Sequence, residues 1–246
     1  MYTNFAYIYD TLMYDIDYSK WADYIEEIFA INNVSPKLLL DLGCGTGNLT
    51  LEMAKRGHES IGIDISPDML SCAKSKALEQ GLDILYLNQD MTDFELYGTV
   101  DAIVCLMDSV NYVTNPRDLK KMFKLVHNYL NPGGIFIFDI NSPFKLEHVL
   151  GNNVFYDISE DASYIWKNYY NSRKKLCEFD LTFFVKEEEY YKKYDEIHYE
   201  RAYSKQELKN IIKDSGLYLS GIYDELKLSK PHSKSKRIFF VCKKQA

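Results

Sequence analysis

The stretch Leu38–Thr50 constrains the fold more than any other part of the chain. Its first residues, Leu38–Leu42, are apolar apart from Asp41, which is typical of a parallel strand covered on both faces. The next residues allow a tight turn and a close approach to a ligand because they include Gly43, Gly45 and Gly47. A helix is predicted from about Asn48, with its free N–H groups pointing back at the turn. The stretch therefore predicts a strand, an anion-binding turn and a helix.

The spacing of the glycines separates two kinds of nucleotide-binding turn. A dinucleotide fingerprint, G-x-G-x-x-G, would need its third glycine at Asn48. The chain instead reads D-x-G-x-G-x-G, which resembles the first motif of class I S-adenosylmethionine (SAM) methyltransferases. The alternative is a glycine-rich turn without a ligand, but a chain seldom accepts three glycines where one would suffice.

Further strands alternate with helices as far as residue 140. The predicted strands are Ser60–Asp64, Ile84–Leu87, Val100–Leu106 and Ile135–Ile140. Such alternation predicts a right-handed, doubly wound parallel sheet, whose ligands collect outside the carboxyl ends of the strands. The polar and backbone groups expected on that edge belong to Asp41, Asp64, Asp90, Leu106 and Asp139.

Two aspartates follow the second and third strands. Asp64 lies about 20 residues past the first glycine, where a carboxylate can accept hydrogen bonds from both ribose hydroxyls of an adenosine ligand. A capping role is the alternative, but Ser66 and Pro67 already supply the first positions of the next helix. Asp90 can accept a hydrogen bond from an adenine amino group, while the backbone N–H after it donates to a ring nitrogen.

The pattern changes after the fifth strand. Apolar residues occupy every second position from Cys177 to Val185, which indicates a half-buried antiparallel strand. We expect three or four such strands, forming a lid over the cofactor edge. A capping box at Ser204 and Glu207 then opens a helix, and two edge strands complete a seven-stranded, mostly parallel sheet.

The predicted organisation has three parts. A helical flap occupies residues 1–35, the α/β core residues 36–141 and 204–246, and the antiparallel β lid residues 142–203. The core resembles class I SAM methyltransferases over residues 38–140 and 204–243. The resemblance implies that the chain binds S-adenosyl-L-methionine.

The resemblance also implies roles at the methionine end of the cofactor. The backbone at Gly43, Cys44 and Gly45 would pass close to the methionine moiety, and Asp41 would orient its ammonium group directly or through water. The carbonyl of Leu106 would accept from the same group. At the adenosine end, the resemblance implies that Asp64 binds the ribose and that Ile65 packs on adenine. It also implies that Asp90 and Met91 recognise the adenine edge.

Aromatic residues of the flap complete the candidate cofactor site. Tyr14 and Trp21 are the candidates there, and Tyr112 is a further one. An aromatic face near a sulfonium contributes on the order of 1 kcal/mol through cation–π attraction. We assign no catalytic base, because an amine acceptor needs only to arrive deprotonated.

A narrower resemblance involves the ends of the chain. Ala6–Asp10 and Asp17-Tyr18 look like the opening of bacterial methyltransferases that dimethylate amino groups of nucleotide-linked deoxysugars. Ser109–Tyr112 and Asp195–His198 are similar to them as well. Related sequences with other substrates share these short motifs, so the acceptor stays open.

Composition excludes several classes of partner. A formal net charge of −7 argues against binding to a phosphate backbone, and the absence of an 18-residue apolar run argues against a membrane span. No signal peptide is evident, and the 5 scattered cysteines without C-x-x-C favour reduced thiols in the cytoplasm and no metal site.

The predicted reaction is an in-line transfer of the sulfonium methyl to N or O of a small-molecule acceptor by a monomer or homodimer. Four residues can touch the acceptor, namely Asp108, Asp139, His198 and Arg201. For each of them, a purely structural role is an equally good interpretation. The alternatives are a nicotinamide-dependent oxidoreductase and a non-catalytic SAM-binding protein.

Overall fold

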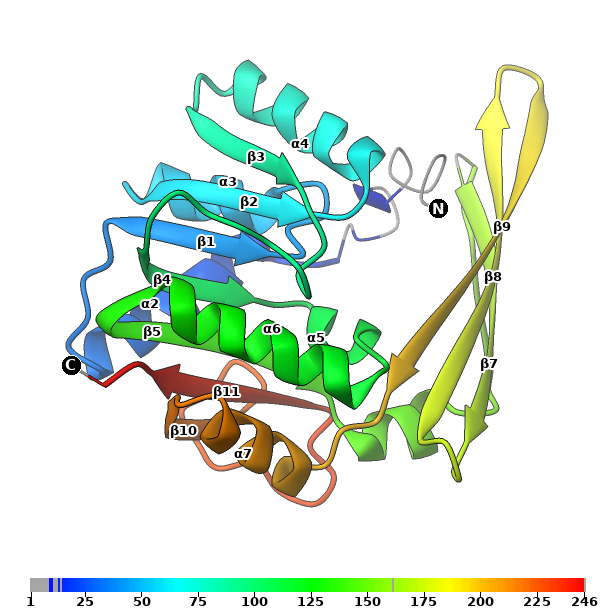
Figure 1. Ribbon diagram of the computed structural model, residues 1–246. Coiled ribbons are helices and arrows are strands. Elements are labelled where there is room, and N and C mark those ends of the chain that lie inside the picture. The colour runs from blue at the N-terminus through cyan, green and yellow to red at the C-terminus, as the bar shows by residue number, and fades with distance from the viewer. Residues whose placement is uncertain (1–8, 11–12, 14, 161, 246) are drawn as a thin grey trace.

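Two sheets form the framework of the protein, for which a computed structural model describes residues 9–10, 13, 15–160 and 162–245. The larger sheet has seven strands in the order β10-β11-β5-β4-β1-β2-β3, and the smaller has four in the order β6-β7-β8-β9. Figure 1 shows the smaller sheet standing beside the carboxyl ends of the parallel strands of the larger one. The fold class predicted from the sequence is thereby confirmed.

The larger sheet alternates with helices as predicted. Its strands are β1 Leu38–Leu42, β2 Glu59–Asp64, β3 Ile84–Asn88, β4 Val100–Cys105, β5 Leu130–Asn141, β10 Tyr218–Asp224 and β11 Arg237–Lys243. The helices are α2 Tyr18–Ile31, α3 Asn48–Lys55, α4 Pro67–Glu79, α5 Ser109–Tyr112, α6 Pro116–Tyr129 and α7 Lys205–Asp214. Strands β1 to β5 pair in parallel, whereas β11 is antiparallel to both β5 and β10.

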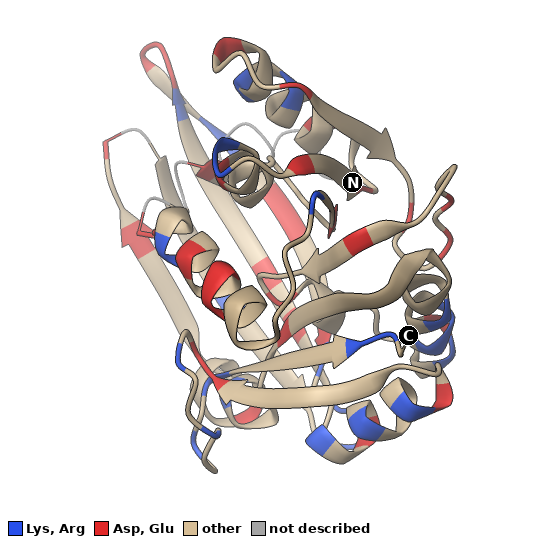
Figure 2. Cartoon of the chain, turned by 90° about the vertical axis from the view of Figure 1, so that its left-hand side faces the viewer, with Lys and Arg blue, Asp and Glu red and all other residues tan. Residues whose placement is uncertain are grey.

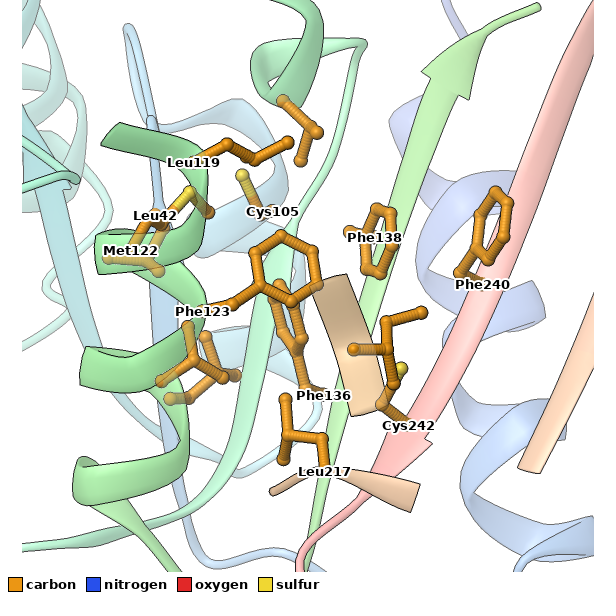
Figure 3. Packing of buried hydrophobic residues seen from close by; sticks show 14 of the residues in the cluster. Leu42, Cys105, Leu119, Met122, Phe123, Phe136, Phe138, Leu217, Phe240 and Cys242 are labelled. Carbon is orange, nitrogen blue, oxygen red and sulfur yellow. The ribbon is translucent and has the colours of Figure 1, made fainter. Parts of the chain in front are cut away.

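Buried side chains fill both faces of the large sheet, because alternate residues of a strand point to opposite sides. The face under α6 and α7 includes Leu40, Ile103, Phe136, Phe138 and Phe240. The opposite face, under α2 and α3, includes Leu39, Val104, Ile137 and Phe239. Figure 3 shows the rings of Phe123, Phe136, Phe138 and Phe240 gathered on the first of these faces. The apolar strands are therefore covered on both sides.

Helix starts follow the local signals in the sequence. The Ser66 hydroxyl accepts from the Met69 N–H at 3.3 Å, with Pro67 at the first position of α4. Ser204 and Glu207 make the reciprocal capping box of α7. These bonds satisfy N–H groups that the helix itself leaves without partners.

Strand β5 differs from its predicted extent. It begins at Leu130 rather than at Ile135, and its register with β4 shifts between these two residues. Between them, Gly133 donates to the Lys244 carbonyl at 3.0 Å, and Lys244 donates to the Gly134 carbonyl at 3.0 Å. Pairing with the C-terminal residues therefore extends the strand past its glycines.

The smaller sheet consists of β6 Val154–Ile158, β7 Ala162–Asn171, β8 Leu176–Glu187 and β9 Tyr190–Arg201. A π-helix, Lys145–Leu150, leads into it from β5. Leu146 and Leu150 of this helix pack against Cys177, Phe179 and Ala202 at the base of the sheet. The smaller sheet is thus anchored at one end by its own apolar cluster.

Figure 2 shows Lys and Arg (blue) and Asp and Glu (red) distributed over several helices, strands and loops of the face that it presents. Within the described residues, no helix has both the length and the apolar character needed to cross a membrane.

Candidate functional site

A cavity of about 410 Å³ opens at the carboxyl edge of the large sheet. It lies where the strand order reverses between β1 and β4, which is the usual ligand position in open α/β sheets. Of the residues predicted to bind the cofactor, the lining includes Asp41, Gly43, Cys44, Gly45, Asp64, Ile65, Asp90, Met91 and Leu106. The volume falls in the range of small-molecule sites.

The turn after β1 forms one wall of the cavity. The N–H groups of Gly43 and Cys44 donate to the Ile63 carbonyl at 2.8 and 3.0 Å, which ties the turn to β2. Gly43 has φ +73°, and a Cβ there would lie 3.0 Å from both Met91 Cε and Ser109 Oγ. The turn therefore needs glycine at this position, both for its backbone conformation and for the close packing around it.

Asp41 lies at the base of the cavity. Its side chain is buried, and Oδ2 accepts from the Thr50 hydroxyl at 2.6 Å. Burial raises the pKa of Asp41 to about 7, and the nearby Asp64 charge acts in the same direction. A cationic ligand group next to Asp41 would favour its ionised form.

Asp64 is held by the backbone at the end of β2. Its Oδ2 accepts from the Gly45 N–H at 2.8 Å, and Oδ1 accepts from the Ser66 N–H at 2.8 Å. Burial raises the pKa of Asp64, against the lowering effect of these backbone hydrogen bonds. Ile65, beside it, lines the cavity and is 60% exposed although it is apolar, so it offers apolar surface to a ligand.

The turn after β3 and the end of β4 complete the predicted set. Asp90 Oδ1 accepts from the N–H and hydroxyl of Thr92 at 2.7 and 2.8 Å. The Leu106 carbonyl accepts from the Ser109 hydroxyl at 2.7 Å. Both groups face the cavity with these local hydrogen bonds already made.

The aromatic candidates are placed differently from one another. Tyr14 lies outside the described residues, and Tyr112 lines the cavity. Trp21 is not part of the lining: it is 5% exposed, with its ring 5.5 Å from that of Phe239 and 5.3 Å from the Arg237 guanidinium carbon. The helical period of α2 turns Trp21 toward the core rather than toward the ligand.

Sequence reasoning missed the contribution of Tyr9 and Tyr18, which both line the cavity. Asp10, next to Tyr9, accepts from the Thr46 hydroxyl at 2.7 Å and the Asn48 amide at 2.8 Å. Thr46 and Asn48 flank Gly47 at the start of α3. The short Tyr9-Asp10 and Asp17-Tyr18 motifs were the signal available, but their positions relative to the turn follow only from the fold.

Lys76 of α4 completes this contact, with Nζ 2.7 Å from Asp10 Oδ2. Burial opposes the ionisation of Asp10, but its hydrogen bonds to Lys76 and Thr46 lower the pKa of its carboxyl. We call Asp10, Thr46, Asn48 and Lys76 the N-terminal clasp, because they join the segment before α2 to the glycine turn.

The four acceptor candidates lie toward the smaller sheet. Asp108 and Asp139 both bind Arg237, as discussed below. The rings of His198 and Tyr112 lie 6.0 Å apart, and burial lowers the pKa of His198 to about 4. Arg201 donates to the Lys174 carbonyl at 3.2 Å at the base of the smaller sheet.

The residues present fit an adenosyl sulfonium cofactor. The glycine turn supplies a close backbone surface, Asp41 a carboxylate for an ammonium group, and Asp64 a carboxylate for a diol. No group of three or more His, Cys, Asp or Glu side chains suited to a metal ion occurs among the residues that the structure describes. Fold and site together define an α/β protein that binds an adenosine-containing cofactor.

Comparisons with known proteins agree with this class. A family profile described as a methyltransferase domain matches residues 39–134. YqeM of Bacillus subtilis strain 168, whose name assigns it to the methyltransferases, is 36% identical over 245 residues, covering 99% of this chain and 97% of its own. The crystal structure of a SAM-dependent methyltransferase from Clostridium acetobutylicum ATCC 824 has 39% identity and a TM-score of 0.91, covering 100% of this chain and 99% of that one.

A more distant structure shares the fold. SAM-bound CalS10, an amino pentose methyltransferase from Micromonospora echinaspora, has 18% identity and a TM-score of 0.77, covering 97% of this chain and 96% of its own. The chain belongs to the SAM-dependent methyltransferases. It is therefore an enzyme whose cofactor is SAM, and this replaces the nicotinamide-dependent and non-catalytic alternatives.

Proposed function

We propose that this methyltransferase transfers the methyl group of SAM to N or O of a small-molecule acceptor by in-line displacement. The observation that carries the proposal is the cavity of about 410 Å³, which has the cofactor residues on one wall and Tyr112 on the side facing the smaller sheet. A cavity of this size suits a metabolite. The formal net charge of −7 argues against binding to the phosphate backbone of a nucleic acid.

The residues of the chain divide the work of binding. SAM, when bound, supplies an electrophilic methyl group. Asp64 would hold the ribose and Asp41 the ammonium group, so that the reactive end is directed toward Leu106 and Ser109. Because the cofactor is intrinsically reactive, the protein contributes mainly alignment and exclusion of water. Tyr9, in the described part of the flap, and Tyr112 also line the cavity.

A screen for product formation tests the proposal. Purified enzyme with SAM should be incubated with amines, hydroxylated metabolites and nucleotide sugars, and S-adenosylhomocysteine (SAH) should be measured for each. We expect at least one small acceptor to give SAH well above the acceptor-free rate, with mass spectrometry showing one or two added methyl groups. SAH release with RNA or protein acceptors alone would contradict a small-molecule substrate.

We also propose a reducing compartment, consistent with the cytoplasm. No disulfide joins the described cysteines, of which Cys105, Cys177 and Cys242 are buried. Thiols of this kind are typical of proteins kept reduced. Thiol titration of protein from rapidly quenched cells should find all 5 cysteines reduced.

A further inference from the structure

A group of charged side chains is buried where the two sheets meet. Arg237, at the start of β11, donates to Asp139 of β5 and lies 2.6 Å from Asp108 Oδ1. Asp108 follows β4 in a turn whose other members, Met107 and Ser109, line the cofactor cavity. The Asp108 side chain keeps 18% of its surface exposed, whereas that of Asp139 keeps none. Asp108 is therefore the more exposed carboxylate of this group, and it lies in the chain between two residues that line the cavity.

The backbone around Asp108 is strained. Met107 has φ +56° and Asp108 φ +57°, a left-handed conformation that residues other than glycine rarely adopt twice in succession. The Asp139 carboxylate accepts from the Asp108 N–H at 3.1 Å and so supports the turn. Asp108 occupies the N-cap position of α5, yet its side chain makes no capping bond. Strained turns of this kind concentrate at functional sites.

A second carboxyl reaches Asp108 from the smaller sheet. Glu200 of β9 is 1% exposed, and its Oε2 accepts from the Asn141 amide at 2.8 Å. The negative charge of Asp108 opposes the ionisation of the Glu200 carboxyl and so raises its pKa. Ionisation of one of the two carboxyls therefore disfavours ionisation of the other.

The surroundings decide which acid keeps the proton. Burial raises the pKa of Glu200 well above its usual range, and the charge of Asp108 adds to this. Burial acts the same way on Asp108, but Arg237 and Lys145 outweigh it and lower the pKa of that carboxyl. The ion pair with Arg237 and these opposite pKa shifts both favour a negative charge on Asp108 rather than on Glu200.

We propose that the Asp108 carboxylate makes the enzyme select an amine as its methyl acceptor. This proposal rests on the methyl transfer proposed above. Asp41 and Asp64 line the cavity, whereas Asp108 is held by Arg237 in the turn between the lining residues Met107 and Ser109. The Asp108 carboxylate accepts an N–H of the amine, and Glu200 acts as the positioning residue that fixes its orientation. The turn formed by residues 106–109 thus joins the cavity wall predicted to bind the cofactor to the carboxylate that binds the acceptor.

The charge balance of the reaction explains this selection. The N–CH₃ bond forms as the S–CH₃ bond breaks, with its electron pair passing to sulfur. The positive charge moves from sulfur to nitrogen, and the amine later releases a proton to solvent. A carboxylate beside the nitrogen is favoured by this movement of charge. A hydroxyl acceptor would instead have to give its proton to a base, and the lowered pKa of Asp108 makes it a poor one.

Sinefungin tests the inference without knowledge of the acceptor. This SAM analogue carries C–NH₃⁺ in place of S–CH₃, so its ammonium replaces the transferable methyl group. Sinefungin and SAH should be titrated calorimetrically into the full-length wild type and three variants at pH 7.5. The variants are Asp108→Asn, Glu200→Gln and the control Asp93→Asn, which alters an exposed carboxylate paired with Lys121.

We expect the wild type to bind sinefungin about tenfold more tightly than SAH, as one charge-assisted hydrogen bond allows. Asp108→Asn should abolish this preference and leave SAH affinity within about twofold. The Glu200→Gln and Asp93→Asn variants should retain the preference for sinefungin over SAH, because Asp108 stays ionised in both.

The outcomes separate the two proposals. Equal affinities of the wild type for sinefungin and SAH would overturn the role of Asp108 without reference to any variant. An unchanged preference in Asp108→Asn would overturn it as well. Failure of SAM, SAH and sinefungin all to bind the wild type would instead overturn the proposed methyl transfer.

Discussion

Asp64 accepts a hydrogen bond from the backbone N–H of Gly45 at 2.8 Å, so the last residue of β2 holds the middle of the glycine turn in place. The same carboxylate accepts from Ser66 and lines the cavity. Its orientation is therefore set before a ligand arrives, and binding of a ribose costs little further ordering.

The cofactor affinity should depend on the ionisation of Asp41. With a pKa of about 7, this carboxyl is largely protonated at pH 6, whereas a ligand ammonium favours its ionised form. Binding must then release a proton, so the SAH affinity should rise with pH, by up to about tenfold per unit below pH 7, and level off above it. Calorimetry from pH 5.5 to 8.5 measures this, and Asp41→Asn should flatten the profile. A wild-type affinity that is constant or falls over this range would contradict the assignment.

The N-terminal clasp should slow cofactor release. Lys76→Met removes the ion pair with Asp10 and the hydrogen bond to Asn48, and it loosens the segment that carries Tyr9. Because the pair is partly exposed, we expect a loss of about 1 kcal/mol, or three- to tenfold faster SAH dissociation. Stopped-flow fluorescence measures the rate. The control is Lys74→Met, an exposed lysine on the same helix, and equal rates in the two variants would argue against the clasp.

The stability of the large sheet should depend on its aromatic stack. The Phe138 ring lies 4.9 Å from that of Phe240 and 5.1 Å from that of Phe136, in stacked geometry (Figure 3). Phe138→Ala should lower the free energy of unfolding by about 3–5 kcal/mol, because it opens a cavity in a close-packed core. Leu78→Ala, at a side chain that is 82% exposed, should change it by no more than about 0.5 kcal/mol. Urea denaturation measures the free energy of unfolding of both variants, and similar losses of stability in the two would contradict this packing.

The parts of the molecule that the sequence predicts are those governed by neighbouring residues. The apolar run before Gly43, the cap at Ser66 and the box at Ser204 each act within a few positions, and the strand order follows from general rules of chain connection. The carboxyl edge could be located because each parallel strand ends there. This is why most of the predicted cofactor residues line one cavity.

The parts that escaped prediction depend on contacts between distant residues. Arg237 meets Asp108 across 129 positions, and Asp10 meets Lys76 across 66. A single sequence gives no signal for such pairs. Trp21 fits both a core position and an aromatic contact to a ligand, and only the rotation of α2 against β11 separates them. The sequence predicts no capping role for Asp64, because Ser66 caps α4, but the Asp64 carboxylate also accepts from the Ser66 backbone N–H.

The most direct test of the account is calorimetric titration of SAH into the wild type and Asp64→Asn, with Asp83→Asn as an exposed control. The wild type and the control should bind one SAH per chain with equal affinity. Asp64→Asn should bind more weakly by about 1–3 kcal/mol, since charge-assisted hydrogen bonds to the ribose are lost. An Asp64→Asn affinity equal to that of the wild type would contradict the placement of the cofactor at the carboxyl edge of the sheet.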